Sequence, residues 1–150
     1  MPKPRPLTKL LLASALLAGS PLTLALEFRS VARDGALWYE QPAANARKLF
    51  IVSKGMPVEI LAEQPGWLRV RDRSGALAWM QAGELSKQRT VQAIRNTTVF
   101  AGPQDKAPVV FRVEKDVLLT LLDAQQNGWI QVQHRDGQRG FVRIEDIWGL

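Results

Sequence analysis

The chain contains no cysteine and a single histidine, His134. Without cysteine it has no disulfide framework, no thiol nucleophile and no lipid-modified cysteine. Nucleophilic catalysis needs a base beside the nucleophile, and zinc needs three or four converging ligands. One histidine, expected at the edge of a hairpin, meets neither requirement. Glu145 and Asp146 are adjacent and point apart, so they do not form the carboxylate pair of a glycosidase. We expect no enzymatic activity, metal site or cofactor.

Long hydrophobic runs are also lacking, and the one short apolar run, residues 10–17, lies near the amino terminus. It follows Lys3, Arg5 and Lys9 and ends at Gly19-Ser20-Pro21, which is the pattern of a secretory signal peptide. Thr23 and Ala25 place small side chains where a signal peptidase cleaves. We expect residues 1–25 to be removed and the rest to be exported to the periplasm. The alternative is an uncleaved membrane anchor, for which the run is short.

Strong charge of one sign is absent once the leader is set aside. The formal net charge is +6, but residues 1–25 hold three of the twenty basic residues and none of the fourteen acidic ones. The remaining chain carries about +3, with its basic residues dispersed among carboxylates. The composition therefore gives little support to nucleic acid as a partner.

The chain after the leader repeats itself. Residues 66–70, Gly-Trp-Leu-Arg-Val, return as residues 128–132, Gly-Trp-Ile-Gln-Val, and residues 49–52 return as residues 110–113. The offset is 61 residues in the first half of the unit and 62 in the second, so one loop residue separates the copies. A fixed period with a single slip indicates duplication of a folded unit.

Each copy alternates apolar and polar residues with the period of a β-strand. Leu68 and Val70 share one face, and the neighbouring residues share the other. Asp136-Gly137 predicts a tight hairpin in which both residues adopt positive φ. We expect five short strands in each unit and a small barrel, with boundaries at residues 26–88 and 89–150. Such small units should lean on each other or on the connection at residues 86–90.

Together these motifs resemble bacterial SH3-like (SH3b) domains. The matching residues of the first unit are Pro42, Lys54-Gly55, Val58-Glu59-Ile60, residues 66–70, Gly75 and Trp79-Met80; those of the second are Gly102-Pro103, residues 128–132, Gly137, Gly140-Phe141-Val142 and Ile147. The whole pattern is similar to that of exported tandem SH3-like proteins of Gram-negative bacteria. The resemblance implies a barrel of five or six strands and a non-catalytic targeting or binding role in the cell wall.

The sequence departs from that family where relatives carry the arginine of an Asn-Val-Arg motif. Tyr39 stands there in the first unit and Phe100 in the second. Trp38 and Tyr39 are adjacent, so in a strand they face opposite sides, and we expect one ring to point outward. The exchange replaces a family arginine by an aromatic face.

The remaining binding candidates lie out of phase with the core residues. Trp67 and Trp129 should lie on the outer face, at a barrel edge or at the seam between the units; a core or seam position is the commoner one for such rings. Arg69 and Arg71 share the outer face with Trp67, where Gln131 and Gln133 replace them in the second unit. The ligand-binding candidates are therefore Tyr39, Trp67, Arg69, Arg71, Phe100 and Trp129. A solvated strand face is the competing interpretation.

The sequence thus predicts an all-β protein of two tandem SH3-like barrels after a cleaved signal peptide. We expect it to be a non-enzymatic binding protein whose partner is cell-wall peptidoglycan or an envelope protein. The alternative is an adaptor that docks an extended or proline-rich peptide in an aromatic groove. An envelope enzyme is the least supported class.

Overall fold

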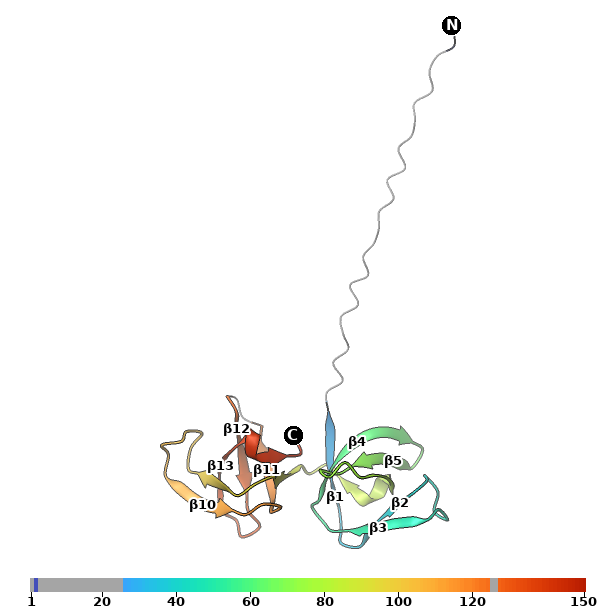
Figure 1. Ribbon diagram of the computed structural model, residues 1–150, viewed down its shortest axis with the longest axis horizontal. Coiled ribbons are helices and arrows are strands. Elements are labelled where there is room, and N and C mark those ends of the chain that lie inside the picture. Colours follow the sequence, from blue (N-terminus) through green and yellow to red (C-terminus); the bar gives the residue numbers. More distant parts are fainter. Residues whose placement is uncertain (1, 3–25, 125–126) are drawn as a thin grey trace.

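The computed structural model describes residue 2, residues 26–124 and residues 127–150. The two long segments form two all-β units side by side (Figure 1). The signal peptide expected at residues 1–25 lies outside the described residues, apart from residue 2. Within the described residues, no helix has the length and apolar character needed to cross a membrane. The expected all-β fold with two tandem units is confirmed.

Each unit is a single antiparallel sheet. The first unit has the strand order β3-β2-β6-β5-β4-β1-β7, and the second repeats it as β10-β9-β13-β12-β11-β8-β14. The strands of the first unit are β1 (Glu27–Val31), β2 (Ala36–Tyr39), β3 (Lys48–Val52), β4 (Pro57–Gln64), β5 (Trp67–Arg71), β6 (Leu77–Gln81) and β7 (Leu85–Ser86), with a 3₁₀ turn, η1 (Ala82–Glu84), before β7. Those of the second are β8 (Thr90–Ala93), β9 (Thr97–Phe100), β10 (Val109–Val113), β11 (Leu118–Asp123), β12 (Trp129–Gln133), β13 (Arg139–Arg143) and β14 (Ile147–Trp148), with η2 (Ile144–Asp146) before β14.

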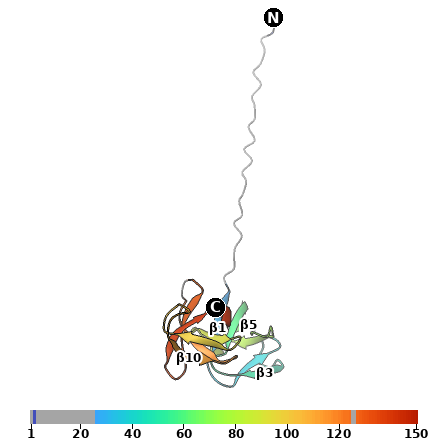
Figure 2. The ribbon, with the colours of Figure 1, turned by 60° about the vertical axis from the view of Figure 1, so that its left-hand side comes forward.

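The described part of each unit has seven strands, where five were expected. The strands β7 and β14 have only two residues each, which is too short for alternation to be visible in the sequence. The strands β1 and β8 place the polar residues Ser30 and Thr90 at buried positions, so their apolar pattern is interrupted. The edge strands β3 and β10 lie on opposite outer sides of the molecule (Figure 1 and Figure 2).

The hairpin loops after β5 and β12 use a turn that differs from the expected one. Gly137 has a φ of 95°, and its N–H donates to the carbonyl of His134 at 2.9 Å, but Asp136 does not adopt positive φ. The expectation of two positive-φ residues is therefore wrong. A type I turn followed by one left-handed glycine closes a three-residue loop and needs only that single glycine. The loop at Gly75 has the same hydrogen bonds.

Each unit has its own hydrophobic core. Trp38, Leu68 and Met80 are among the residues that fill the first, and Leu119 and Ile130 are among those that fill the second. On β5, Leu68 and Val70 are buried while the residues between them are not, as strand alternation requires.

The connection between the units is hydrogen-bonded to both of them. Ser30 Oγ donates to the carbonyl of Gln88 at 2.6 Å, and Thr90 Oγ1 donates to the carbonyl of Gly55 at 2.6 Å. Arg89 lies 5.6 Å from the centre of the Phe28 ring and donates to the carbonyl of Gly149 at 2.7 Å. Phe28 also packs edge-on against Trp148, with ring centres 5.0 Å apart. The first and last strands therefore meet at this seam.

Candidate functional site

The outer face of β5 carries three of the candidate residues, Trp67, Arg69 and Arg71. All three alternate with the buried Leu68 and Val70, so they point away from the core. Arg69 is exposed and stands opposite Trp79 of β6 in the sheet register. Within the described residues, Arg69 forms no ion pair or side-chain hydrogen bond. This face therefore presents the guanidinium of Arg69, which has no partner among the described residues, and the partly exposed indole ring of Trp67.

Tyr39 is buried rather than outward. Its exposed fraction is 7%, and that of the adjacent Trp38 is 1%. The two side chains do leave β2 on opposite faces, but the Trp67 ring packs edge-on against Tyr39, with ring centres 5.1 Å apart and planes at 90°. The expectation that one ring of the pair is outward is wrong, because alternation fixes the side of a strand and not what covers it. The buried Tyr39 ring therefore packs against the Trp67 ring and supports it.

The second unit contains the same aromatic pair, but it is covered. Phe100 and Trp129 pack edge-on with ring centres 5.7 Å apart, and Trp129 is 7% exposed. The guanidinium of Arg143 lies 4.9 Å from the Trp129 ring centre, and an ion pair to Asp105 holds it there. In the first unit the residue in register with Trp67 is Gln81, in the position of Arg143. The Trp67 indole of the first unit is therefore more exposed than the Trp129 indole of the second.

Arg71 is engaged in an ion pair that the sequence interpretation missed. Its Nε and Nη2 donate to Oε2 of Glu59 at 2.9 and 2.5 Å. The Glu59 side chain is 5% exposed, whereas that of Arg71 is 46% exposed. In the register of the second unit, Thr120 and Gln133 replace this pair. Arg71 therefore neutralises a buried carboxylate and is not a free cation for a ligand. The sheet register, in which Glu59 faces Arg71, was the signal that could have shown it.

A cleft of about 700 Å³ lies between the two units, at a place that the sequence did not indicate. Its walls come from the first unit, the connection and the second unit. They are Ser30, Val31, Ala32, Asp34, Lys54 and Gly55; Ser86, Gln88 and Thr90; and Val117 to Thr120 with Gln133, His134 and Arg135. Cavities of this volume at domain interfaces are common binding sites.

His134 lies in this cleft and is held by local contacts. Its Nδ1 is 3.1 Å from a carboxylate oxygen of Asp136, and its ring centre is 5.7 Å from that of Phe111. The backbone N–H of Gln138, with the Gln138 amide and His134 adding to it, lowers the pKa of Asp136 to about 2. Asp136 is therefore a carboxylate at neutral pH. Among the described residues, no three His, Cys, Asp or Glu side chains converge as metal ligands would.

Asp146 is held by polar contacts within the second unit. Its Oδ2 accepts a hydrogen bond from Thr97 Oγ1 at 2.7 Å, and its backbone carbonyl accepts from the N–H of Ile94. Glu145, its neighbour, is exposed and lies 4.0 Å from Arg143. The two carboxylates therefore have different partners, and neither caps the 3₁₀ turn through its side chain.

Comparison with known proteins identifies the repeated unit. The family model described as bacterial SH3 domain matches residues 32–87 and residues 95–149. No curated protein matches the chain significantly. Similar solved structures include NlpC2 from Trichomonas vaginalis, with 16% identity over 83% of this chain and 48% of that one, and NlpC1 from Trichomonas vaginalis, with 19% identity over 89% and 49%; both have a TM-score of 0.38. An NlpC/P60 family protein from Bacillus cereus ATCC 10987 has 13% identity over 81% and 56%, also with a TM-score of 0.38. The chain spans about half the length of these proteins.

Proposed function

Because the chain belongs to the bacterial SH3 domain family, we propose that it is a non-enzymatic binding protein of the bacterial cell envelope. Its partner is cell-wall peptidoglycan or a wall-associated protein. The observation that carries the proposal is the occurrence of the family's domain twice in succession, at residues 32–87 and 95–149. A repeated binding module raises the apparent affinity for a repetitive polymer, because the second contact forms at a high effective concentration.

The proposed location is the periplasm. The basic start, the short apolar run at residues 10–17 and the small residues before position 26 support export through a signal peptide. A protein delivered there encounters the wall polymer and the proteins attached to it.

A non-catalytic role is supported by the surroundings of the titratable groups. The only histidine of the chain, His134, contacts Asp136 and the Phe111 ring. In a nucleophilic site it would instead stand within hydrogen-bond reach of a hydroxyl or thiol. Arg71 and Glu59 neutralise each other, and Asp146 is held by Thr97.

We assign the first contact with the wall to the outer face of the first unit. Trp67 presents a partly exposed ring, and Arg69 adds a cation with no partner among the described residues. Tyr39 and Arg71 contribute indirectly, since Tyr39 is buried against the Trp67 ring and Arg71 is paired with Glu59. Phe100 and Trp129 of the second unit contribute less, because Arg143 covers that indole.

The test is a pull-down of the purified protein with isolated sacculi at low and high salt. Wild type should sediment with sacculi at low salt and be released as salt rises, because exposed charges are screened over about 10 Å at 0.1 M. Arg69→Gln should weaken binding, whereas Arg112→Gln, which removes an exposed arginine of β10, should not. Failure of wild type to bind at low salt would refute the peptidoglycan proposal.

The second candidate function is an adaptor for an extended or proline-rich peptide. It is favoured by the edge-on Tyr39 and Trp67 rings, since aromatic grooves dock such peptides in other recognition domains. A synthetic proline-rich peptide that perturbs the Trp67 indole N–H signal, with no binding to sacculi, would identify this function.

A further inference from the structure

The two units face each other through equivalent elements. In the first unit the N–H of Lys54 donates to Asp34 Oδ1 at 2.8 Å, and in the second the N–H of Lys115 donates to Asn96 Oδ1 at 2.9 Å. The next residue in each turn has positive φ. It is Gly55 in the first unit, with φ 84°, and Asp116 in the second, with φ 72°. Gly55 and Asp116 therefore occupy the same position of a repeated turn.

The hairpin loops are equivalent as well. Each has an arginine two residues before its positive-φ glycine. These are Arg73 before Gly75 in the first unit and Arg135 before Gly137 in the second. The hairpin of one unit approaches the turn of the other, which is the reciprocal arrangement expected of a two-fold interface.

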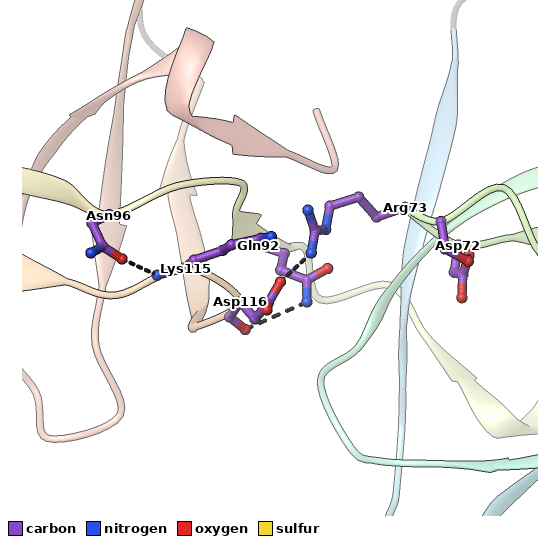
Figure 3. A network of polar contacts seen from close by, with 7 residues as sticks. Asp72, Arg73, Gln92, Asn96, Lys115 and Asp116 are labelled. Atoms are coloured by element: carbon purple, nitrogen blue, oxygen red, sulfur yellow. Dashed lines mark hydrogen bonds and ion pairs between the residues drawn. The ribbon is translucent and has the colours of Figure 1, made fainter.

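One side of this interface is closed by an ion pair. Arg73 of the first unit bonds to the carboxylate of Asp116 in the second (Figure 3). Gln92 adds a bond from its amide to the carbonyl of Asp116 at 3.4 Å. The Arg73 side chain thus reaches across the interface to an aspartate whose backbone conformation non-glycine residues seldom adopt.

The opposite side lacks the matching carboxylate. On this side Arg135 takes the place of Arg73, and Gly55 takes the place of Asp116. Arg135 and Gly55 both line the 700 Å³ cleft. Neither Arg135 nor the Lys54 side chain has an ion pair or hydrogen-bond partner among the described residues. Asp34 is the one carboxylate in the wall, and its Oδ1 is already held by a backbone N–H. The wall of the cleft therefore carries two cations, Lys54 and Arg135, against one carboxylate.

We propose that this cleft binds an extended peptide segment that carries a carboxylate, and that the carboxylate occupies the position of the missing acidic side chain beside Arg135 and Lys54. This site is distinct from the outer face of the first unit. A carboxylate gains strong, charge-assisted hydrogen bonds from a guanidinium and an ammonium group.

The rest of the wall fits a peptide better than a sugar. Val117, Leu118 and Leu119 supply an apolar surface for small side chains, and the amide of Gln133 has no hydrogen-bond partner in the described part of the chain. Phe, Tyr and Trp rings, on which sugar rings stack, are absent from the residues that line the cleft. An apolar surface with a few convergent polar groups is the usual composition of a small-ligand site.

The repeat suggests the test, because Gly55→Asp would place in the first unit the carboxylate that Asp116 supplies in the second. Asp116 shows that an aspartate tolerates this turn, and a Cβ on Gly55 would lie 3.6 Å from Leu118 Cδ1, an ordinary contact. The matched control is Gly55→Asn, which adds the same shape and backbone strain without charge. A second pair of variants is Arg135→Gln and Arg112→Gln, of which only the first lies in the cleft.

The probes are N-acetyl-tetra-alanine with a free carboxylate, the same peptide as its carboxamide, and N-acetyl-Ala-Glu-Ala-amide. Amide spectra of the ¹⁵N-labelled protein should shift at Lys54, Leu118 and Arg135 with the first or third peptide, which distinguishes a terminal from a side-chain carboxylate. Gly55→Asp and Arg135→Gln should weaken that binding by on the order of tenfold, while Gly55→Asn and Arg112→Gln retain it. Equal binding by Gly55→Asp and Gly55→Asn, equal binding of the carboxamide, or no shift with either acidic peptide would overturn the proposal. Sacculus binding does not enter this readout, so the two proposals fail separately.

Discussion

The pairing of Arg71 with Glu59 predicts that the two arginines on the outer face of β5 contribute differently to stability. Arg71→Ala removes both hydrogen bonds to Glu59 Oε2 and leaves a carboxylate that is 5% exposed without its cation. Arg69 on the same face has no ion-pair partner among the described residues. The two arginines look alike in the sequence, but only Arg71 should matter for folding.

The size of the effect follows from the burial of the two groups. Removing one partner of a fully buried pair costs about 3–5 kcal/mol. Water reaches this pair through the Arg71 side chain, which is 46% exposed, so we place the loss at about 2 kcal/mol, within the range for hydrogen bonds to charged groups. In a domain of this size such a loss lowers the thermal midpoint by roughly 10 °C.

Thermal and urea unfolding followed by far-ultraviolet circular dichroism would measure it. The control on the same face is Arg69→Ala, which should change the free energy of unfolding by less than about 0.5 kcal/mol. The second unit suggests a rescue, because Thr120 and Gln133 stand where Glu59 and Arg71 stand. The double variant Glu59→Thr with Arg71→Gln should recover most of the lost stability. If Arg71→Ala unfolds like wild type, or if the double variant is less stable than the single one, the reasoning about the buried carboxylate is refuted.

Three further predictions concern other parts of the chain. Trp129→Ala should cost about 3–5 kcal/mol because that ring is buried, and Trp67→Ala should cost less because its ring is partly exposed; equal losses in urea unfolding would contradict this. A carboxyl-carbon NMR titration should give Asp136 a pKa of about 2 instead of 3.8, because the N–H of Gln138 stabilises the carboxylate. Since the folded pKa is the lower one, this stabilisation is complete above the unfolded pKa and is lost as the pH falls through about 2; a midpoint at 3.8 would be inconsistent with the hydrogen bond. Mass spectrometry of the envelope protein should show Leu26 as the amino terminus, and intact Met1 in a membrane fraction would indicate an anchor instead.

The sequence predicted the parts of the fold that depend on local periodicity. Leu68 and Val70 alternate with polar or outward residues, and a strand with that pattern has one buried face wherever it lies. The repeat offset then predicted that both units share one topology, which the two sheets have. These features required no knowledge of how the units contact each other.

The remaining features depend on contacts between residues that are distant in the sequence. Tyr39 was placed on the correct side of its strand, but the Trp67 ring that buries it comes from a different strand. The sequence placed Arg71 on the outer face of its strand but did not indicate its partner. That partner, Glu59, is buried at a position that alternation alone does not assign to a carboxylate. The cleft requires the relative placement of two units, which no pattern within either unit contains.

The difference between Gly55 and Asp116 also has an evolutionary consequence. Glycine codons beginning GG and the aspartate codons GAU and GAC differ at their second base, so one nucleotide substitution can convert a GGU or GGC glycine into aspartate. A duplicated gene could therefore close either side of the interface, or reopen it, in a single mutational step at the position of Gly55 or Asp116. Two identical copies joined head to tail would begin with both sides in the same state, and one such substitution would be enough to give them separate roles.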